Sequence, residues 1–289
     1  MSAPPITIPG TQVHTLHSDI VGDDYEISVI PPPPGFATGP VPVVYVLDGS
    51  GFAPIAATAV RLLIFGGEIP PVLVVGIGYP AGTDPVEIQR LRHRDFTHKH
   101  IDELAGLLSA AFGIQASELE MGGAHPFLRF LTEDVRPWTA ERFDVTGDTT
   151  LIGVSSAGLF ATWTLLHHPA AFNRYAIGTP HVSFEQGSPR AWVEDYAAKH
   201  SDLDAAVFLA AGAEEHLRGP YPAPGATLAE AHGADSAITG EIGEALQACG
   251  FPNLRLATRI RPEETHWTLA VGALLPQGLR HVFATDGQH

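Results

Sequence analysis

The sequence is poor in cysteine, in lysine and in long apolar runs, and each shortage excludes a class of protein. Cys249 is the only cysteine, so no intrachain disulfide and no thiolate metal cluster can form. Lys and Arg number 16 against 32 Asp and Glu, and the net charge of −16 argues against a surface that binds nucleic acid or an anionic membrane. No stretch approaches the ~20 apolar residues of a membrane helix, and residues 1–20 lack the basic and apolar regions of a secretory signal. We therefore expect a cytoplasmic protein with no membrane or nucleic-acid partner.

The chain has enough apolar sequence for one large core. Its 289 residues are 45% hydrophobic and 17% charged, and a chain of this size buries roughly three quarters of its unfolded surface on folding. No internal repeat, low-complexity tract or linker divides the sequence into two cores. We expect residues 1–289 to form a single domain, and the sequence leaves its oligomeric state open.

Short β-rich segments predict a sheet that is mostly parallel. Alternating runs at 13–17 and 25–30 predict an antiparallel strand pair. Later runs are continuous and apolar, as in strands buried on both faces; these are Val43–Leu47, Val72–Val75, Thr150–Val154 and Ala206–Ala210. Segments with helical spacing, such as 101–108 and 127–131, separate them, and residues 226–248 predict a further helix. The predicted fold class is α/β, with a mostly parallel central sheet and helices on both faces.

The segment Thr150–Phe160 carries the most chemical information. A buried strand runs into Gly153-Val-Ser-Ser-Ala-Gly and then into an apolar helix. A serine between small residues at such a strand–helix junction is typical of a nucleophile elbow, whose tight turn exposes the hydroxyl above the sheet. Gly153 and Ala157 flank Ser155 at the two constrained positions, so Ser155 is the predicted nucleophile and Ser156 its rival. Taken alone, the segment is equally typical of a Gly/Ser-rich connection without chemistry.

A reactive serine needs a base that a third group orients. Glu214 and Glu215 follow the predicted strand at 206–210, at the sheet edge where α/β proteins place their sites. His266 follows the alternating segment 254–260. The order serine, acid, histidine is the one expected for an elbow of this kind. Solvated loops carry the same residue types, so the sequence order supports the triad more than any single residue does.

The tetrahedral intermediate of acyl transfer also needs backbone donors for its oxyanion. The amide of Ser156 directly follows the predicted nucleophile and is the first candidate donor. The second is the amide of Ser50, in the glycine-flanked turn after the strand that ends near Leu47. The same turn is also an ordinary connection between a strand and a helix.

Several segments together resemble the putative-esterase branch of the α/β-hydrolases, and are most similar to ferric-siderophore (catecholate trilactone) esterases. They are Tyr45–Gly49, Arg92–Thr97, Gly122–Leu128, Gly153–Phe160 and the loop residue His266. The likeness runs from about residue 11 to residue 283. Related groups in that branch are S-formylglutathione hydrolases and mycolyl-type acyltransferases.

The resemblance implies an α/β-hydrolase that cleaves a small-molecule carboxylic ester through an acyl-enzyme. It implies Ser155 as nucleophile, His266 as base and Glu215, rather than Glu214, as acid, although some enzymes of this type work without an acid. It also implies that no metal or organic cofactor is needed. Val154 and Ala157 depart from the His and Gly that the family commonly has there. The alternatives are an acyltransferase, a thioester hydrolase, or a binding module without catalysis on the same scaffold.

A cluster of cations stands out in this acidic chain. Arg92 and Arg94 belong to a group of four cations within ten residues, which local carboxylates can neutralise or which can face an anionic substrate. We therefore treat these two arginines as candidate substrate-binding residues. Three histidines occur nearby, at 93, 98 and 100, but their spacing places no two on one helical face with a carboxylate, so we expect no metal site there.

Overall fold

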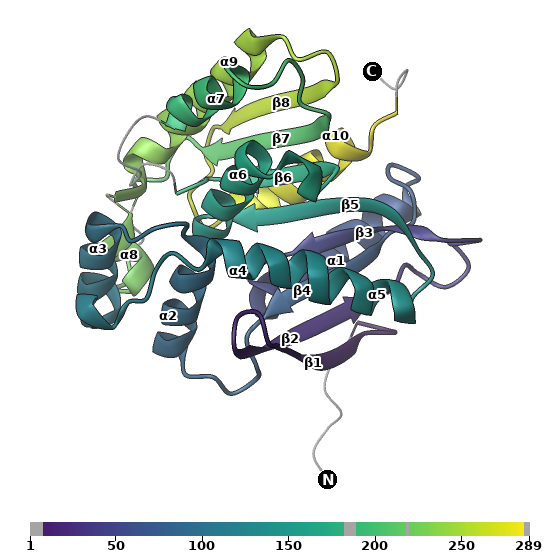
Figure 1. The fold of residues 1–289 in the computed structure, drawn as a ribbon, viewed down its shortest axis with the longest axis horizontal. Coiled ribbons are helices and arrows are strands. Elements are labelled where there is room, and N and C mark those ends of the chain that lie inside the picture. The colour runs from purple at the N-terminus through teal and green to yellow at the C-terminus, as the bar shows by residue number, and fades with distance from the viewer. Residues whose placement is uncertain (1–7, 182–188, 218–219, 230, 286–289) are drawn as a thin grey trace.

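The computed structural model describes residues 8–181, 189–217, 220–229 and 231–285, and these form one eight-stranded sheet with helices on both faces (Figure 1). The strands are β1 (Gln12–Ser18), β2 (Asp23–Ile30), β3 (Val41–Val46), β4 (Leu73–Gly78), β5 (Val145–Val154), β6 (Arg174–Gly178), β7 (Ala205–Gly212) and β8 (Leu254–Arg261). Their spatial order is β1-β2-β4-β3-β5-β6-β7-β8. β2 pairs antiparallel with β1 and β4, and every other neighbouring pair is parallel. The predicted α/β class is confirmed.

Helices cover the sheet in two groups. One face carries α2 (Pro85–Phe96), α3 (Asp102–Phe112), α4 (Ala124–Arg129), the π-helix η2 (Phe130–Val135), α5 (Arg136–Arg142), α6 (Ser156–His167), α7 (Pro189–Ala197) and α9 (Asp235–Cys249). The other carries α1 (Gly49–Phe65), the π-helix η6 (Ala270–Gly278) and α10 (Leu279–Phe283). Shorter helices are η1 (Ala116–Glu118), η3 (Pro169–Ala171), α8 (Pro224–Leu228) and η5 (Ala231–Ala234).

Two buried cores explain why the central strands are apolar at every position. Val43 and Tyr45 of β3 pack into one core, whereas Val44 and Val46 pack into the other. Successive side chains of a strand point to opposite faces, so a strand between two layers of helices must be apolar without alternation. The continuous apolar runs of the sequence were therefore interpreted correctly.

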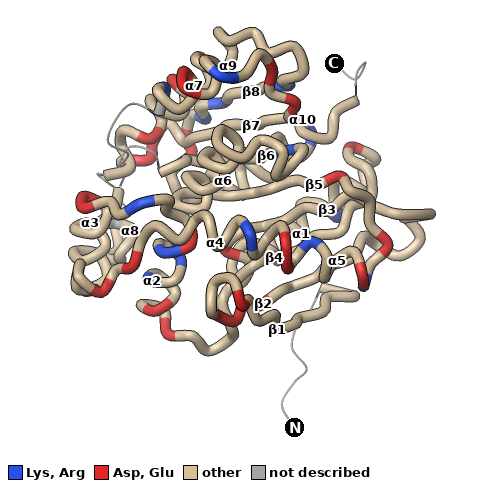
Figure 2. The backbone as a smooth tube through the Cα atoms, in the orientation of Figure 1, with Lys and Arg blue, Asp and Glu red and all other residues tan. Residues whose placement is uncertain are grey.

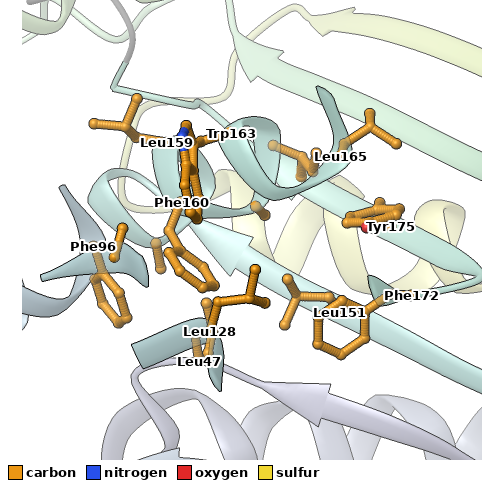
Figure 3. Packing of buried hydrophobic residues seen from close by; sticks show 14 of the residues in the cluster. Leu47, Phe96, Leu128, Leu151, Leu159, Phe160, Trp163, Leu165, Phe172 and Tyr175 are labelled. Atoms are coloured by element: carbon orange, nitrogen blue, oxygen red, sulfur yellow. The ribbon is translucent and has the colours of Figure 1, made fainter. Parts of the chain in front are cut away.

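Helix α6 is buried on nearly all sides, and it begins at Ser156, directly after Ser155. Phe160 packs against Phe96 of α2, with ring centroids 6.0 Å apart, and against Trp163, 5.9 Å away (Figure 3). Leu159 and Leu165 are also fully buried on this helix. Burial of each large side chain stabilises the folded protein by about 2 kcal/mol. This packing holds α6 firmly against the sheet.

Two features differ from the sequence prediction. β6 was not predicted, because it begins with Arg174 and ends with Gly178, which leaves too short a run of apolar residues between them. The single helix expected over 226–248 is divided into α8, η5 and α9. Gly233 lies at the break, within the turn that directs His232 into the protein interior. Burial of that imidazole overrides the helical propensity of the surrounding alanines.

Six parallel strands, β3 to β8, end at the same edge of the sheet, and candidate site residues follow five of them. Their carboxyl ends lead directly to Asp48 after β3, Ser155 after β5, Thr179 after β6, Glu215 after β7 and His266 after β8. Figure 2 shows that Lys and Arg are sparse on the chain, and several of them lie along α2 near this edge. None of the helices that the structure describes has both the length and the apolar composition needed to span a bilayer.

Candidate active site

Ser155 occupies a strained turn between β5 and α6. Its backbone has φ 62° and ψ −125°, a conformation that non-glycine residues rarely adopt. The turn brings Gly153 so close to the first turn of α6 that a Cβ there would lie 2.3 Å from the carbonyl oxygen of Ala157. Gly158 meets the backbone of β6 in the same way, since a Cβ there would lie 2.7 Å from the oxygen of Gly178. The small residues of the motif are therefore required by close backbone approach.

The structure brings Glu215 and His266 together, 51 residues apart in sequence. Oε2 of Glu215 lies 3.1 Å from Nδ1 of His266, and both side chains are buried. Oε1 of Glu215 accepts hydrogen bonds from the hydroxyl of Thr179 (2.5 Å) and the amide of Gly212 (2.7 Å). Glu214 is only half-buried and meets Glu264 through its backbone amide. Of the two candidate acids, Glu215 is thus the one that contacts the histidine.

The contact with Glu215 determines which ring nitrogen of His266 carries the proton. Because the carboxylate accepts from Nδ1–H, Nε2 is left with a lone pair that can accept a proton. Burial lowers the pKa of His266 below its ordinary value, and the Glu215 carboxylate partly offsets this by favouring the charged ring. The ring is therefore neutral, and able to act as a base, at neutral pH.

The N-termini of two helices, α1 and α6, border the same cavity. Ser156 is the first residue of α6 and Ser50 the second residue of α1, so neither amide has an acceptor within its own helix. Asp48 begins α1 in a left-handed conformation, with φ 53°. Gly78 of β4 allows the close approach, because a Cβ there would lie 2.8 Å from the Ser50 nitrogen. Together the two helix ends offer donors and partial positive charge to an anion.

A cavity of about 340 Å³ joins these groups. Ser155, His266, Ser156 and Ser50 all line it. Much of its remaining wall is apolar and includes Phe52, Ile88, Leu104, Leu107, Leu108, Phe112, Leu228 and Trp267. Its volume is in the range of sites that hold small molecules, with a few convergent polar groups in a mainly apolar wall.

His93 has a place in the site that the sequence did not suggest. Its Nε2 accepts from the hydroxyl of Ser156 at 3.1 Å, and its Nδ1 donates to the carbonyl of Gln89 at 2.7 Å. Burial, and secondly the positive charge of Arg92, lower the pKa of His93 to about 3. A ring that holds a proton so weakly is a poor general base. Ser156 is also fully buried. Its hydrogen bond to His93 therefore fits a structural contact better than the activation of Ser156 as a second nucleophile.

Arg92 and Arg94 lie in different surroundings. Arg92 lines the cavity, and its Nε donates to Asp48 at 2.8 Å; burial alone would lower the pKa of Arg92, but the Asp48 carboxylate raises it above the ordinary value. Arg94 is not among the cavity-lining residues. It is paired with Asp23 and with the buried Asp95, whose carboxylate also accepts from two tyrosine hydroxyls. Of the two candidate substrate-binding arginines, only Arg92 borders the cavity.

Sequence reasoning missed a second group of buried residues beside His266. In His181, His232 and Asp235, one polar side-chain atom of each residue lies within 4.8 Å of those of the other two. Asp235, Glu215 and His266 form a second group of three with the same spacing. Nδ1 of His232 lies 3.2 Å from Oδ2 of Asp235. Hydrogen bonds join His232 to Asp235 and His266 to Glu215, so we treat these residues as a hydrogen-bonded cluster. The three-residue spacing of His232 and Asp235 was visible in the sequence, but their proximity to His266 was not.

Sequence relatives of this chain are esterases. It is 28% identical to the ferri-bacillibactin esterase BesA of Bacillus subtilis, over 98% of this chain and 93% of that enzyme. It is 25% identical to the siderophore triacetylfusarinine C esterase of Aspergillus fumigatus, over 90% of this chain and 89% of that enzyme. The two relatives come from a bacterium and a fungus, so the similarity extends across distant lineages.

Solved structures show the same fold. The BES protein of Bacillus cereus superposes with a TM-score of 0.78 at 24% identity and covers 99% of each chain. The siderophore hydrolase EstA of Aspergillus nidulans gives a TM-score of 0.78 at 22% identity, over 96% of this chain and 97% of that one. The family described as "Putative esterase" matches residues 18–235, about three quarters of the chain. With this match, the α/β-hydrolase fold and the sequence relatives in agreement, the chain belongs to the putative-esterase family and is a carboxylic ester hydrolase.

Proposed function

We propose that the protein is a serine esterase in which Ser155, His266 and Glu215 form the catalytic triad. The observation that carries the proposal is that the strained Ser155 and His266 border one cavity, although they come from separate strand ends, and that Glu215 contacts His266. A single domain over residues 1–289 is part of the proposal, supported by the one sheet that contains all the described strands.

In the proposed reaction, Ser155 Oγ attacks the ester carbonyl carbon while Nε2 of His266 takes its proton. Glu215 stabilises the resulting imidazolium across the 3.1 Å contact. Collapse of the tetrahedral intermediate breaks the ester C–O bond, and His266 returns the proton to the departing alkoxide. Water then attacks the acyl-enzyme with His266 again as base, and Ser155 is regenerated.

The amides of Ser156 and Ser50 are the proposed donors to the oxyanion. Both stand in the first turn of a helix at the cavity wall, so the charge that develops on the carbonyl oxygen meets fixed donors and two helix dipoles. The Ser156–His93 contact supports this role, because it holds the Ser156 residue in one position. Loss of one such donor typically costs about 10²–10³ in rate.

A siderophore ester is the proposed substrate class, because both named sequence relatives hydrolyse siderophores. Arg92 is the proposed substrate-contacting cation, because it borders the cavity and Arg94 does not. The cytoplasm is the proposed location, which agrees with a chain whose single cysteine can form no internal disulfide.

The test of the proposal is labelling with a fluorophosphonate probe, together with hydrolysis of a p-nitrophenyl ester and of a catecholate trilactone. Ser155→Ala should abolish hydrolysis and labelling, while the melting temperature stays within a few degrees of the wild type. Ser201→Ala, on an exposed surface residue, is the matched control and should keep both activities. Full hydrolysis by Ser155→Ala, or labelling that moves to Ser156, would show that the nucleophile is elsewhere.

A further inference from the structure

A second histidine–carboxylate pair lies directly on the proposed catalytic base. The ring of His232, in η5, stacks on the ring of His266 with centroids 3.7 Å apart and an interplanar angle of 12°. Nδ1 of His232 lies 3.2 Å from Oδ2 of Asp235, the first residue of α9. His232 is 1% exposed and Asp235 is fully buried. The triad does not use either residue.

The stack constrains a freedom that the Glu215 contact leaves open. One hydrogen bond at Nδ1 fixes the direction of that bond but still allows the His266 ring to tilt about it. A second ring at van der Waals distance fixes the plane of the first. The Asp235 carboxylate in turn holds His232 in orientation, as buried hydrogen-bonded partners do for the residue that performs the chemistry.

The negative charges beside His266 also support its role as the base. His266 becomes positive each time it takes the proton of Ser155, and a buried positive charge needs compensation. Glu215 supplies it at one edge of the ring, and the Asp235 carboxylate lies within 4.8 Å of the polar atoms of both residues. The face of the His232 imidazole adds a polarisable surface next to the positive charge on His266.

Other elements also face this group. His181, which follows β6, packs on His232 with centroids 4.7 Å apart, and its Nε2 lies 3.8 Å from Asp235. Trp267 meets His266 edge-on at 5.1 Å. Burial lowers the pKa of His266, Glu215 raises it, and the neighbouring His232 and Arg92 of α2 lower it further. Burial keeps the pKa of His181 well below its ordinary value, so this ring is neutral near pH 7.

We propose that His232 and Asp235 are positioning residues that hold the ring of His266 in the plane from which Nε2 reaches Ser155. This inference rests on the proposed function, since it assigns the pair a role toward the proposed base. Neither residue exchanges protons with the substrate.

Three variants separate the parts of the proposal. His232→Ala removes the stacked ring and should lower kcat by about ten- to a hundredfold, because a poorly placed base loses much of its effect. His232→Phe restores a ring to the stack without the bond to Asp235 and should recover a large part of that loss. Asp235→Asn keeps the shape and an acceptor oxygen but removes the charge. The acidic limb of its kcat/KM profile should therefore move to lower pH, with KM within about twofold of the wild type.

His17→Ala is the matched control, because His17 and Asp24 form a histidine–carboxylate pair on the surface of β1 and β2. It should leave kcat and the pH profile unchanged. If His232→Ala fails to fold in a thermal melt, the Phe and Asn variants carry the test. A wild-type kcat in His232→Ala, or a kcat of His232→Phe that stays about a hundredfold below the wild type, together with an unmoved limb in Asp235→Asn overturns the inference. Activity in Ser155→Ala would instead overturn the proposed function, so the two failures are distinguishable.

Discussion

We predict that the folded protein loses stability in mild acid, because the imidazole of His93 is buried. The ring is 2% exposed, and both of its nitrogens are engaged, with Gln89 and Ser156. Burial and the neighbouring Arg92 lower its pKa to about 3, against about 6.5 for an exposed histidine. Between these two values the unfolded chain binds a proton at His93 and the folded chain does not. The free energy of unfolding therefore falls as the pH falls through this window.

The size of the effect follows from the shift. Each pH unit below about 6.5 removes about 1.4 kcal/mol of the free energy of unfolding, until the folded ring itself is protonated. From pH 7.5 to pH 5 the contribution of His93 amounts to about 2 kcal/mol. Other histidines add to the total, since burial also lowers the pKa values of His98, His167, His168, His181 and His266. The contribution of one ring must therefore be measured as a difference between variants.

Urea denaturation at pH 7.5 and pH 5 provides that difference. His93→Gln removes the titrating ring and leaves an amide that can still accept from Ser156. Its loss of stability between the two pH values should be about 2 kcal/mol smaller than that of the wild type. His100→Gln, on an exposed residue, is the control and should lose as much as the wild type. An equal loss in His93→Gln and the wild type would refute a neutral, hydrogen-bonded His93 in the folded protein.

Two further predictions concern the triad and the elbow. Glu215→Gln should lower kcat by about 10²–10⁴-fold in steady-state ester hydrolysis, because an amide neither fixes the Nδ1–H form of His266 nor stabilises its charge. Glu214→Gln is its control, and the opposite ranking of the two variants would assign the acid to Glu214. Gly153→Ala should abolish activity and lower the free energy of unfolding by about 1–3 kcal/mol in urea denaturation, because the added methyl would lie 2.3 Å from the carbonyl oxygen of Ala157. Gly147→Ala on the same strand has open space around the new methyl, and an equal loss in both variants would contradict the steric argument.

Local patterns predicted the sheet well because each strand carries its own signature. The run around Val43–Leu47 is apolar at every position, and β3 does lie between two cores. β6 was missed because Arg174 and Gly178 at its two ends interrupt the apolar pattern. The helix expected over 226–248 is interrupted because His232 is buried against His266, a contact between residues that the sequence does not relate.

The candidate site was predictable where its chemistry is local. Gly153 and Ala157 around Ser155 indicated a tight turn, and the positive φ of Ser155 agrees with it. The arginines were less predictable. Arg92 and Arg94 are two positions apart on one helix, yet one borders the cavity beside Asp48 and the other is paired with Asp23 and the buried Asp95.

The sequence by itself determined the strand–turn–helix around Ser155, the apolar strands and the chain order of serine, acid and histidine. These depend on sterics and hydrophobicity within a few residues of each other. Only the tertiary structure decided that Glu215 contacts His266, that His93 bonds to Ser156, and that His232 stacks on the proposed base. Each of these contacts joins residues from different strand ends or helices. They exist because parallel strands deliver their carboxyl ends to one edge, where distance in space no longer follows distance along the chain.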